Sequence, residues 1–212
     1  MGRRERNREL TRARLLAAAL DLMGTKGPDG TGIAEITEQA DVGFGTFYSY
    51  FESKDAILAA ALEDVAEQLA ATISSATSSI EDPAAAVAAL ARHLVTWAGE
   101  NPSSGRFLVE VGLARDAVRR HLGVLLARQC DRGVQSGRFD ARSADTAKSV
   151  VGGAVRATIA AWLDGHLHAD PGPALAAQIL LSLGLPSEEA WQLAEAPLPP
   201  LTTPSTSQRT TP

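Results

Sequence analysis

The chain has 212 residues, 45% of them hydrophobic, which is enough for a packed core in one or two domains. Its formal net charge of −5 at pH 7 argues against a protein that coats nucleic acid over its whole surface. A single cysteine, Cys130, excludes a disulfide framework within the chain and fits a reducing cytoplasm.

The charge is unevenly distributed along the sequence. Residues 1–14 hold six arginines and two glutamates, a local charge of +4, whereas residues 55–212 carry the entire net charge of −5. A basic leading arm and an acidic body suit a protein that contacts DNA at one end only. Arg4 and Arg6 are therefore candidate DNA contacts, and a merely flexible, solubilising arm is the alternative.

No segment alternates apolar and polar residues as a strand does, so the sequence predicts an all-helical fold. The first helix is expected from about residue 8 to residue 25, where Gly27-Pro28 stops it. Its apolar stripe consists of Leu15, Ala19, Leu22 and Met23.

Two short apolar-periodic segments follow, separated by a tight break at residues 41–43. Ile33, Ile36 and Ala40 share one helical face, and Phe47 and Phe51 share another, which we expect to be buried. Two short helices joined by a turn that contains glycine form a helix-turn-helix. The second helix, expected over about residues 44–51, would then enter the major groove of DNA.

The outer face of this second helix supplies the candidate DNA contacts. Gly45 has no side chain where the backbone would meet the duplex, and the Thr46 hydroxyl and methyl suit a phosphate oxygen or a thymine methyl. Ser49 also faces outward. Phe44 has two open interpretations: it contacts thymine methyls, or it packs on Tyr48 one turn later.

The residues ADVGFGTFY at positions 40–48, followed by Tyr50-Phe51-x-Ser53-Lys54, resemble the recognition segment of the tetracycline-repressor (TetR-like) family. The lead-in over residues 11–36 is similar to the same family, so the resemblance covers about residues 10–58. It implies a DNA-binding head joined to a larger helical effector domain, with the Tyr48 hydroxyl on a phosphate. Lys54, beside the N-terminal amides of the next helix, is a further candidate phosphate contact, with a solvated lysine as the alternative.

Three positions depart from that family pattern. Gly32 and Gly43 replace the usual Ser or Thr caps, and Ala34 replaces a long polar residue that often contacts DNA. Each change removes one potential phosphate contact.

Capping signals place the remaining helices. Ser53 is an expected N-cap for a long helix that ends near residue 79, and Asp82-Pro83 opens the next helix, which ends near residue 99. Further helices are expected over residues 106–114, 116–135, 143–165, 171–184 and 187–195. The predicted organisation is a DNA-binding head at 1–54, a ligand-binding and dimerisation domain at 55–195, and a disordered Pro/Thr/Ser tail at 196–212.

The resemblance implies a pocket for a small inducing ligand between the helices of the body. The candidate lining residues are His93, Trp97, Phe107, Glu110 and Trp162. Ordinary core positions for the two tryptophans, and a surface position for Glu110, are the alternatives.

Small residues cluster in one helix of the body. Val150, Gly153, Ala154 and Ala157 permit close helix–helix approach. Together with Leu175 and Ile179 they resemble the dimer-forming four-helix interface of the family. Packing within one chain is the alternative.

Several chemistries are not expected. His166 and His168 would not converge on a metal ion if helical, and no further ligands stand at metal spacing. No Ser/His/Asp, Cys/His or glycine-rich phosphate constellation is present, so we expect neither a catalytic site nor a cofactor. The longest apolar run, residues 149–163, is interrupted by Arg156, so we expect a cytoplasmic protein with no membrane-spanning segment.

The sequence therefore predicts a homodimeric, ligand-responsive transcriptional regulator. Its partners would be a palindromic double-stranded DNA operator and a small-molecule effector, and repression is the expected mode. One alternative is a constitutive or architectural DNA-binding protein without an effector. Another is a helical enzyme with an incidental helix-turn-helix.

Overall fold

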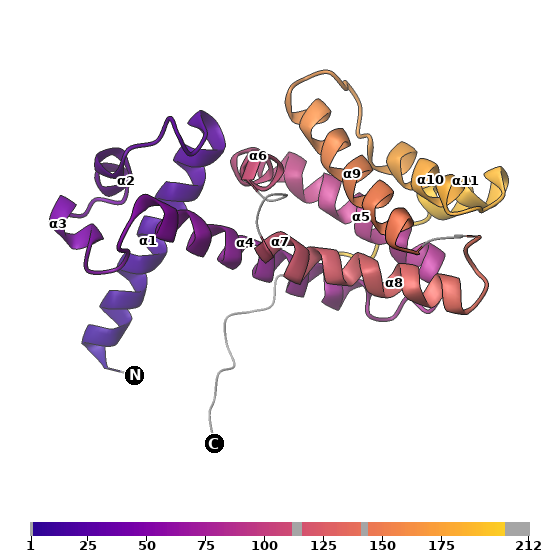
Figure 1. Ribbon diagram of the computed structural model, residues 1–212, viewed down its shortest axis with the longest axis horizontal. Coiled ribbons are helices and arrows are strands. Elements are labelled where there is room, and N and C mark those ends of the chain that lie inside the picture. Colours follow the sequence, from indigo (N-terminus) through magenta and orange to yellow (C-terminus); the bar gives the residue numbers. More distant parts are fainter. Residues whose placement is uncertain (1, 112–115, 141–143, 202–212) are drawn as a thin grey trace.

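A computed structural model describes residues 2–111, 116–140 and 144–201, and this part of the chain contains helices and no strands. The all-helical prediction is confirmed (Figure 1). In chain order the helices are α1 (Arg3–Lys26), α2 (Ile33–Gln39), α3 (Phe44–Phe47), α4 (Lys54–Thr77), α5 (Pro83–Glu100), α6 (Pro102–Val111), α7 (Asp116–Val118), the π-helix η2 (Arg119–Gly123), α8 (Val124–Gln135), α9 (Ala144–Leu163), α10 (Gly172–Ser182) and α11 (Ser187–Glu195).

Helices α1–α3 form a head at one end of an elongated molecule, and α4 runs from this head along the body (Figure 1). The apolar stripe of α1 packs on α2, on the segment after α3 and on the first turns of α4. This core also contains Phe107 and Val111 of α6, both buried. The hydrophobic core of the head therefore extends across the domain boundary that the sequence predicts at residue 54.

Helix α4 begins where the sequence predicts it. Ser53 is extended, and its hydroxyl accepts a hydrogen bond from the Ala56 N–H at 3.1 Å. Such an N-cap stabilises a helix by about 1 kcal/mol. The buried face of α4 then runs from Ile57 to Ile73, first against the head and later against α5.

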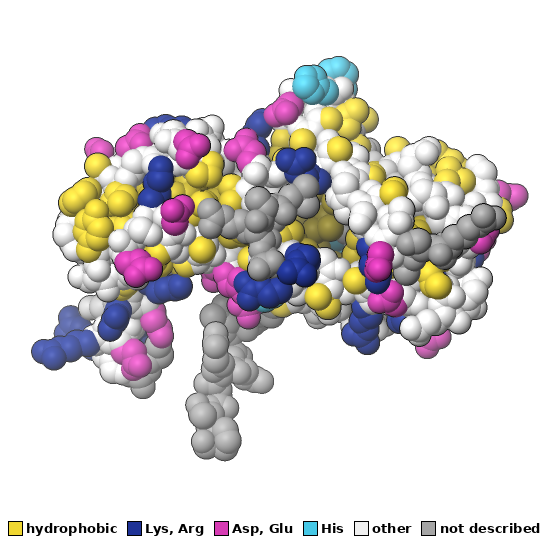
Figure 2. All heavy atoms as spheres, in the orientation of Figure 1, with side chains coloured by type: hydrophobic (Ala, Val, Ile, Leu, Met, Phe, Trp, Pro, Cys, Tyr) yellow, Lys and Arg dark blue, Asp and Glu magenta, His cyan; other side chains and the backbone are white. Residues whose placement is uncertain are grey.

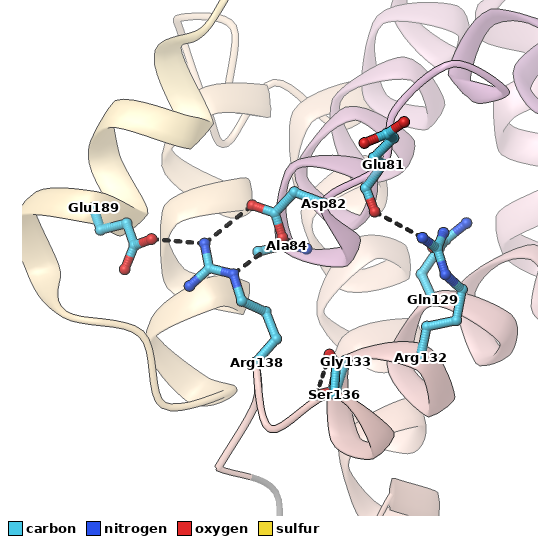
Figure 3. Close-up of polar contacts among 9 residues, drawn as sticks. All are labelled: Glu81, Asp82, Ala84, Gln129, Arg132, Gly133, Ser136, Arg138 and Glu189. Atoms are coloured by element: carbon cyan, nitrogen blue, oxygen red, sulfur yellow. Dashed lines mark hydrogen bonds and ion pairs between the residues drawn. The ribbon is translucent and has the colours of Figure 1, made fainter.

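Helix α5 is the centre of the body and packs against α6 and α8–α11. Its N-cap, Asp82, accepts from the Ala84 N–H at 3.0 Å and forms a two-point ion pair with Arg138, which follows α8. Arg138 also donates to Glu189 of α11 at 2.6 Å (Figure 3). The Arg138 guanidinium thus connects the segment after α8 to the N-terminus of α5 and to α11.

Burial alone would raise the pKa of Asp82. The hydrogen bonds from Arg138 and from the Ala84 backbone outweigh this effect, so its pKa is lowered. The hydrogen bonds of Arg138 to Asp82 and to Glu189 raise the pKa of Arg138. Both groups are therefore charged at neutral pH.

Three helix boundaries differ clearly from the predictions. Helix α6 begins at Pro102 rather than at residue 106. Helix α1 begins at Arg3 rather than near residue 8, and Glu5 accepts from the Gly2 N–H at its start. Helix α3 ends at Phe47 rather than near residue 51. There the N–H groups of Ser49 and Tyr50 bond three residues back, which tightens the backbone into turns.

Some predictions lie partly or wholly outside the described residues. These are the end of the helix expected at 106–114, the helix start at Ser143 and most of the tail, from residue 202 onward.

Candidate nucleic-acid interface and effector cavity

The turn between α2 and α3 is fixed by a contact with α1. Asp41 has a φ of 51°, a left-handed conformation that Asp tolerates better than most residues. The Arg14 guanidinium donates to the Asp41 carbonyl at 3.0 Å and to its carboxylate at 2.9 Å. This pair was not predicted from the sequence, although an acidic residue in the turn and arginines on α1 were its visible signal.

Aromatic side chains connect the outer face of α3 to the core of the head. Phe44 and Tyr48 are 54% and 53% exposed, and their rings meet edge to face at 5.8 Å. Tyr48 in turn meets the ring of Phe47 at 5.3 Å, and Phe47 packs against Phe51. Phe47 and Phe51 are buried, which confirms their predicted core positions. In Figure 2, hydrophobic side chains gather at the end of the molecule that carries α3.

The remaining candidate contacts on this segment are accessible to different degrees. Gly45 and Ser49 are exposed, and Thr46 is half-buried. A Cβ atom added at Gly45 would meet no heavy atom within 4 Å. Gly43 provides no side-chain cap for α3, as the sequence predicts.

The basic arm is the helical start of α1, with Arg4 and Arg6 exposed. Later arginines are held against the head. The guanidinium of Arg8 lies 5.9 Å from the ring centroid of Tyr50, and that of Arg12 lies 5.6 Å from the centroid of Phe51. The arm therefore presents its charge from a fixed helix.

Lys54 binds within the head. Its ammonium donates to the carbonyls of Pro28 and Thr31, at 2.9 and 3.2 Å, and so ties the α1–α2 loop to the start of α4. An ammonium has three N–H donors, so a third donor remains after these two hydrogen bonds.

A cavity of about 900 Å³ lies in the body, between α4, α5, α6, the η2–α8 segment and α9. Most of its lining is aliphatic, including Leu90, Leu94, Leu108, Leu122, Leu125 and Val155. Ser149, Lys148 and Arg156 add polar groups along α9. In Figure 2 the surface is hollowed near the middle of the molecule, with hydrophobic side chains on the floor.

None of the five predicted pocket residues lines this cavity. Phe107 is buried in the core of the head, and Glu110 is exposed. Trp97 and Trp162 are half-buried and pack against the body core, and a Cβ atom at Gly99 would lie only 2.3 Å from the Trp162 ring. Their neighbours on α5 and α6 line the cavity instead.

His93 is buried, and its Nε2 atom has no hydrogen-bond partner among the described residues. Burial, with a smaller contribution from nearby Arg92, lowers the pKa of His93. The imidazole is therefore neutral near pH 7.

The π-helix η2 links the cavity wall to α4. Arg120 donates to Glu63 of α4 at 2.8 Å, and His121 Nε2 lies 2.7 Å from the other oxygen of the same carboxylate. The His121 hydrogen bond is the largest cause of the lowered pKa of Glu63. π-Helical turns often occur at functional sites.

The predicted dimer residues divide into two groups. On α9, Val150, Gly153 and Ala157 are exposed and Ala154 is half-buried. A Cβ atom at Gly153 would have no neighbour within 4 Å. Leu175 and Ile179 of α10 instead lie in the core of the protomer, 7% and 2% exposed.

His166 and His168 are exposed, and the described part of the chain contains no group of three His, Cys, Asp or Glu side chains that could hold a metal ion. Among residues 2–111, 116–140 and 144–201, no helix is both long and apolar enough to cross a membrane.

Two family models match the chain. Residues 15–61 match the model described as "Bacterial regulatory proteins, tetR family", and residues 82–196 match "Tetracyclin repressor-like, C-terminal domain". A relative from Bacillus subtilis (strain 168), the uncharacterized HTH-type transcriptional regulator YvdT, is 38% identical over 52 residues. That match covers 24% of this chain and about a quarter (27%) of the relative.

Solved structures are similar over much more of the chain. RolR in complex with resorcinol is 35% identical, with a TM-score of 0.74 over 93% of this chain and 100% of that one. RolR without ligand is 34% identical, with a TM-score of 0.72 over 90% of this chain and 100% of that one. The regulator FadR from Bacillus subtilis, in complex with stearoyl-CoA, has a TM-score of 0.70 at 18% identity, over 81% and 96% of the two chains. At that identity the likeness is one of fold alone.

Proposed function

Since the chain belongs to the TetR family, whose members are DNA-binding transcriptional regulators and not enzymes, we propose that it is a dimeric repressor released from its operator by a small molecule. The observation that carries this proposal is the joint presence of an accessible α3 face and a large cavity, with α4 in contact with both regions. Such a protein acts in the cytoplasm, where its DNA is.

The DNA-binding surface in this proposal is the outer face of α3 and its following turn. Phe44, Gly45, Thr46, Tyr48 and Ser49 would face the major groove. Arg4, Arg6 and the remaining N–H of Lys54 would supply positive charge for phosphates. Two heads related by a twofold axis meet equivalent groove faces, so the operator is a palindrome with half-sites about 10 base pairs apart or a multiple of this.

The effector site in this proposal is the cavity of about 900 Å³. Its aliphatic lining favours a mainly apolar molecule, and Ser149, Lys148 and Arg156 on one wall favour a polar end. RolR, 35% identical over nearly the whole chain, is described in complex with resorcinol, a small aromatic diol. We therefore propose a small aromatic or amphipathic effector.

Release follows from a shift between two conformations of the dimer. An effector between α6, η2 and α9 would move the cavity wall, and Glu63 joins that wall to α4. A small tilt of α4 then changes the spacing of the two heads. Specific binding would be lost, while nonspecific binding, which depends on charge, would change little.

The test begins with selection of bound sequences from a random DNA pool by the full-length protein. We expect an imperfect palindrome. Resorcinol and related small phenols, aromatic acids and fatty acids are then titrated against the selected operator and a scrambled duplex. Preferential loss of operator binding supports release by an effector, whereas equal loss on both duplexes contradicts the spacing mechanism.

A constitutive DNA-binding protein is the second candidate, and the same titration separates the two. A constitutive protein would bind the operator with the same affinity in the presence and absence of each compound, and no compound would raise its melting temperature.

A further inference from the structure

The recognition segment lacks the side chains that most often identify bases through hydrogen bonds. Residues 40–53 contain no Arg, Lys, Asn, Gln or His. Guanine is usually recognised by a bidentate Arg or Lys, and adenine by a bidentate Asn or Gln. The amide immediately before the segment, Gln39, donates to Asp21 of α1 at 2.9 Å.

The acidic residues of the segment do not replace those donors. An acidic side chain can accept a hydrogen bond from cytosine, but Asp41 is paired with Arg14 in the turn before α3. Glu52 follows the turns after α3 and precedes the N-cap of α4. Within this segment, base recognition falls to hydroxyl groups and to apolar contact.

The most prominent apolar group on this surface is Phe44. It is the first residue of α3, it is 54% exposed, and glycines stand on both sides of it in the sequence. Gly45 has open space where a side chain would be, which allows the backbone to approach the floor of the groove.

The Phe44 ring is supported by Tyr48, which connects it to the core of the head. Tyr48 meets it edge to face at 5.8 Å and itself rests on the buried ring of Phe47 at 5.3 Å. An aromatic ring supported from the core presents a fixed apolar edge at little cost in conformational entropy. In the major groove, the C5-methyl of thymine is the apolar group that distinguishes one base from the others.

We infer that Phe44, supported by Tyr48, determines operator specificity by packing against the 5-methyl group of a thymine in each half-site. This inference rests on the proposed operator binding and adds to it the chemistry by which the sequence is recognised. The two interpretations of Phe44 that the sequence left open are then compatible, since the contact with Tyr48 orients the ring for the base.

The test uses the full-length protein and its selected operator, with single thymines replaced by deoxyuridine. This replacement removes only the methyl group. At the recognised position, the wild-type affinity is expected to fall about fourfold for one half-site and about fifteenfold for both, the effect of one buried methyl at each site. Phe44→Ala should bind the thymine and deoxyuridine operators equally, and Phe44→Leu should keep part of the difference.

Leu10→Ala is the matched control, because Leu10 is an exposed apolar residue of the same head on α1. Its thymine-to-deoxyuridine ratio should equal that of the wild type. Thermal unfolding of Phe44→Ala checks that the head remains folded.

The experiment distinguishes a failure of the thymine inference from a failure of the proposed function. If the wild type bound the thymine and deoxyuridine operators equally at every position, thymine recognition would be wrong while operator binding stood. The inference is also wrong if Phe44→Ala retains the full wild-type ratio. If the unmodified protein selected no sequence at all, the proposed function itself would fail, and the inference with it.

Discussion

In the proposed function, Gly45 is neutral for folding and important for DNA binding. Its surroundings are empty in the free protein, so Gly45→Ala should leave the free energy of unfolding unchanged or raise it by up to about 1 kcal/mol, because alanine favours helix. The added methyl would lie between the backbone and the duplex. We expect a clear loss of operator affinity, measured by fluorescence anisotropy. Unchanged affinity would show that the α3 backbone does not approach the bases.

The Asp82–Arg138 pair makes one part of the stability dependent on pH. Asp82→Asn keeps an oxygen for the helix cap but removes the charge, and should lower the free energy of unfolding at pH 7 by about 1–2 kcal/mol. Because the pKa of Asp82 is lowered in the folded state, its contribution is complete above the ordinary carboxyl pKa, near 4. It is lost as the pH falls from there through the lowered pKa.

Urea denaturation of the wild type and Asp82→Asn, from pH 7 down to about pH 3, measures this difference. The gap between the two proteins should close at the acid end. Glu189→Gln, which leaves the helix cap and the Asp82 pair intact, is the control and should give a smaller loss at pH 7. A gap of the same size at both ends of the range would assign the effect to packing instead.

At the scale of helices, α1 and α6 approach most closely at Gly24, where no side chain separates α1 from the backbone of α6. A Cβ atom at Gly24 would lie 2.1 Å from the backbone oxygen of Ser103, which cannot move aside without shifting α6. Gly24→Ala should therefore destabilise the protein by about 1–3 kcal/mol despite the higher helix propensity of alanine. The melting temperature is the measurement, and Gly45→Ala is the matched control on a helix with open space. An equal effect of both changes would contradict a close α1–α6 contact.

Helix boundaries that depend on local signals could be predicted from the sequence. Ser53 and Asp82-Pro83 carry their own capping chemistry, and α4 and α5 begin there as expected. The end of α3 could not be predicted, because Tyr48 and Tyr50 are compatible with a continuing helix. The turns after α3 form where the chain returns towards α4, and this return depends on the tertiary fold.

The proposed DNA-binding face and the cavity also differ in how far their residues can be located from the sequence. Phe44, Gly45 and Tyr48 lie within one short segment, so their periodicity places them on one surface. The cavity wall is formed by helices that are far apart in the sequence. Its aliphatic residues cannot be distinguished from ordinary core residues by the sequence alone. Large aromatic and ionisable residues were therefore predicted for the effector pocket, whereas aliphatic residues such as Leu94 and Leu108 line the cavity.

At the scale of the whole molecule, Glu63 is the proposed connection between the effector cavity and the DNA-binding head. Glu63→Gln weakens the contacts with His121 and with Arg120, which lines the cavity, but it replaces no residue of the cavity lining. We expect near-normal effector affinity, but a reduction of about 0.5–2 kcal/mol in the coupling between effector and operator. Operator affinity with and without effector gives this coupling. Glu67→Gln, one turn later on α4 and exposed, is the control, and equal coupling in both variants would place the connection elsewhere.

The exposed face of α9 is the proposed contact between two copies. Gly153 lines the cavity, and a Cβ atom added there has no neighbour within 4 Å in its own protomer, so the start of a side chain is accommodated without a clash. Gly153→Arg should therefore remain folded and sediment as a monomer, with weak binding to a palindromic operator. Gln192→Arg, at an exposed position of α11, should remain dimeric. A dimer that survives Gly153→Arg would move the interface to another face.

The shared core of α1–α4 and α6 limits how this protein could be rebuilt as a biosensor. A hybrid regulator is most simply made by exchanging the DNA-binding segment at the end of the helix-turn-helix. In this chain that junction would place a foreign α1 against Phe107 and Val111, which are packed in the native core of the head. A working graft would have to carry the inner face of α6 along with the head, yet the outer face of the same helix presents Leu108 and Val109 to the cavity. The proposed DNA-binding head and the proposed effector cavity therefore share one ten-residue helix, and neither could be redesigned without testing the other.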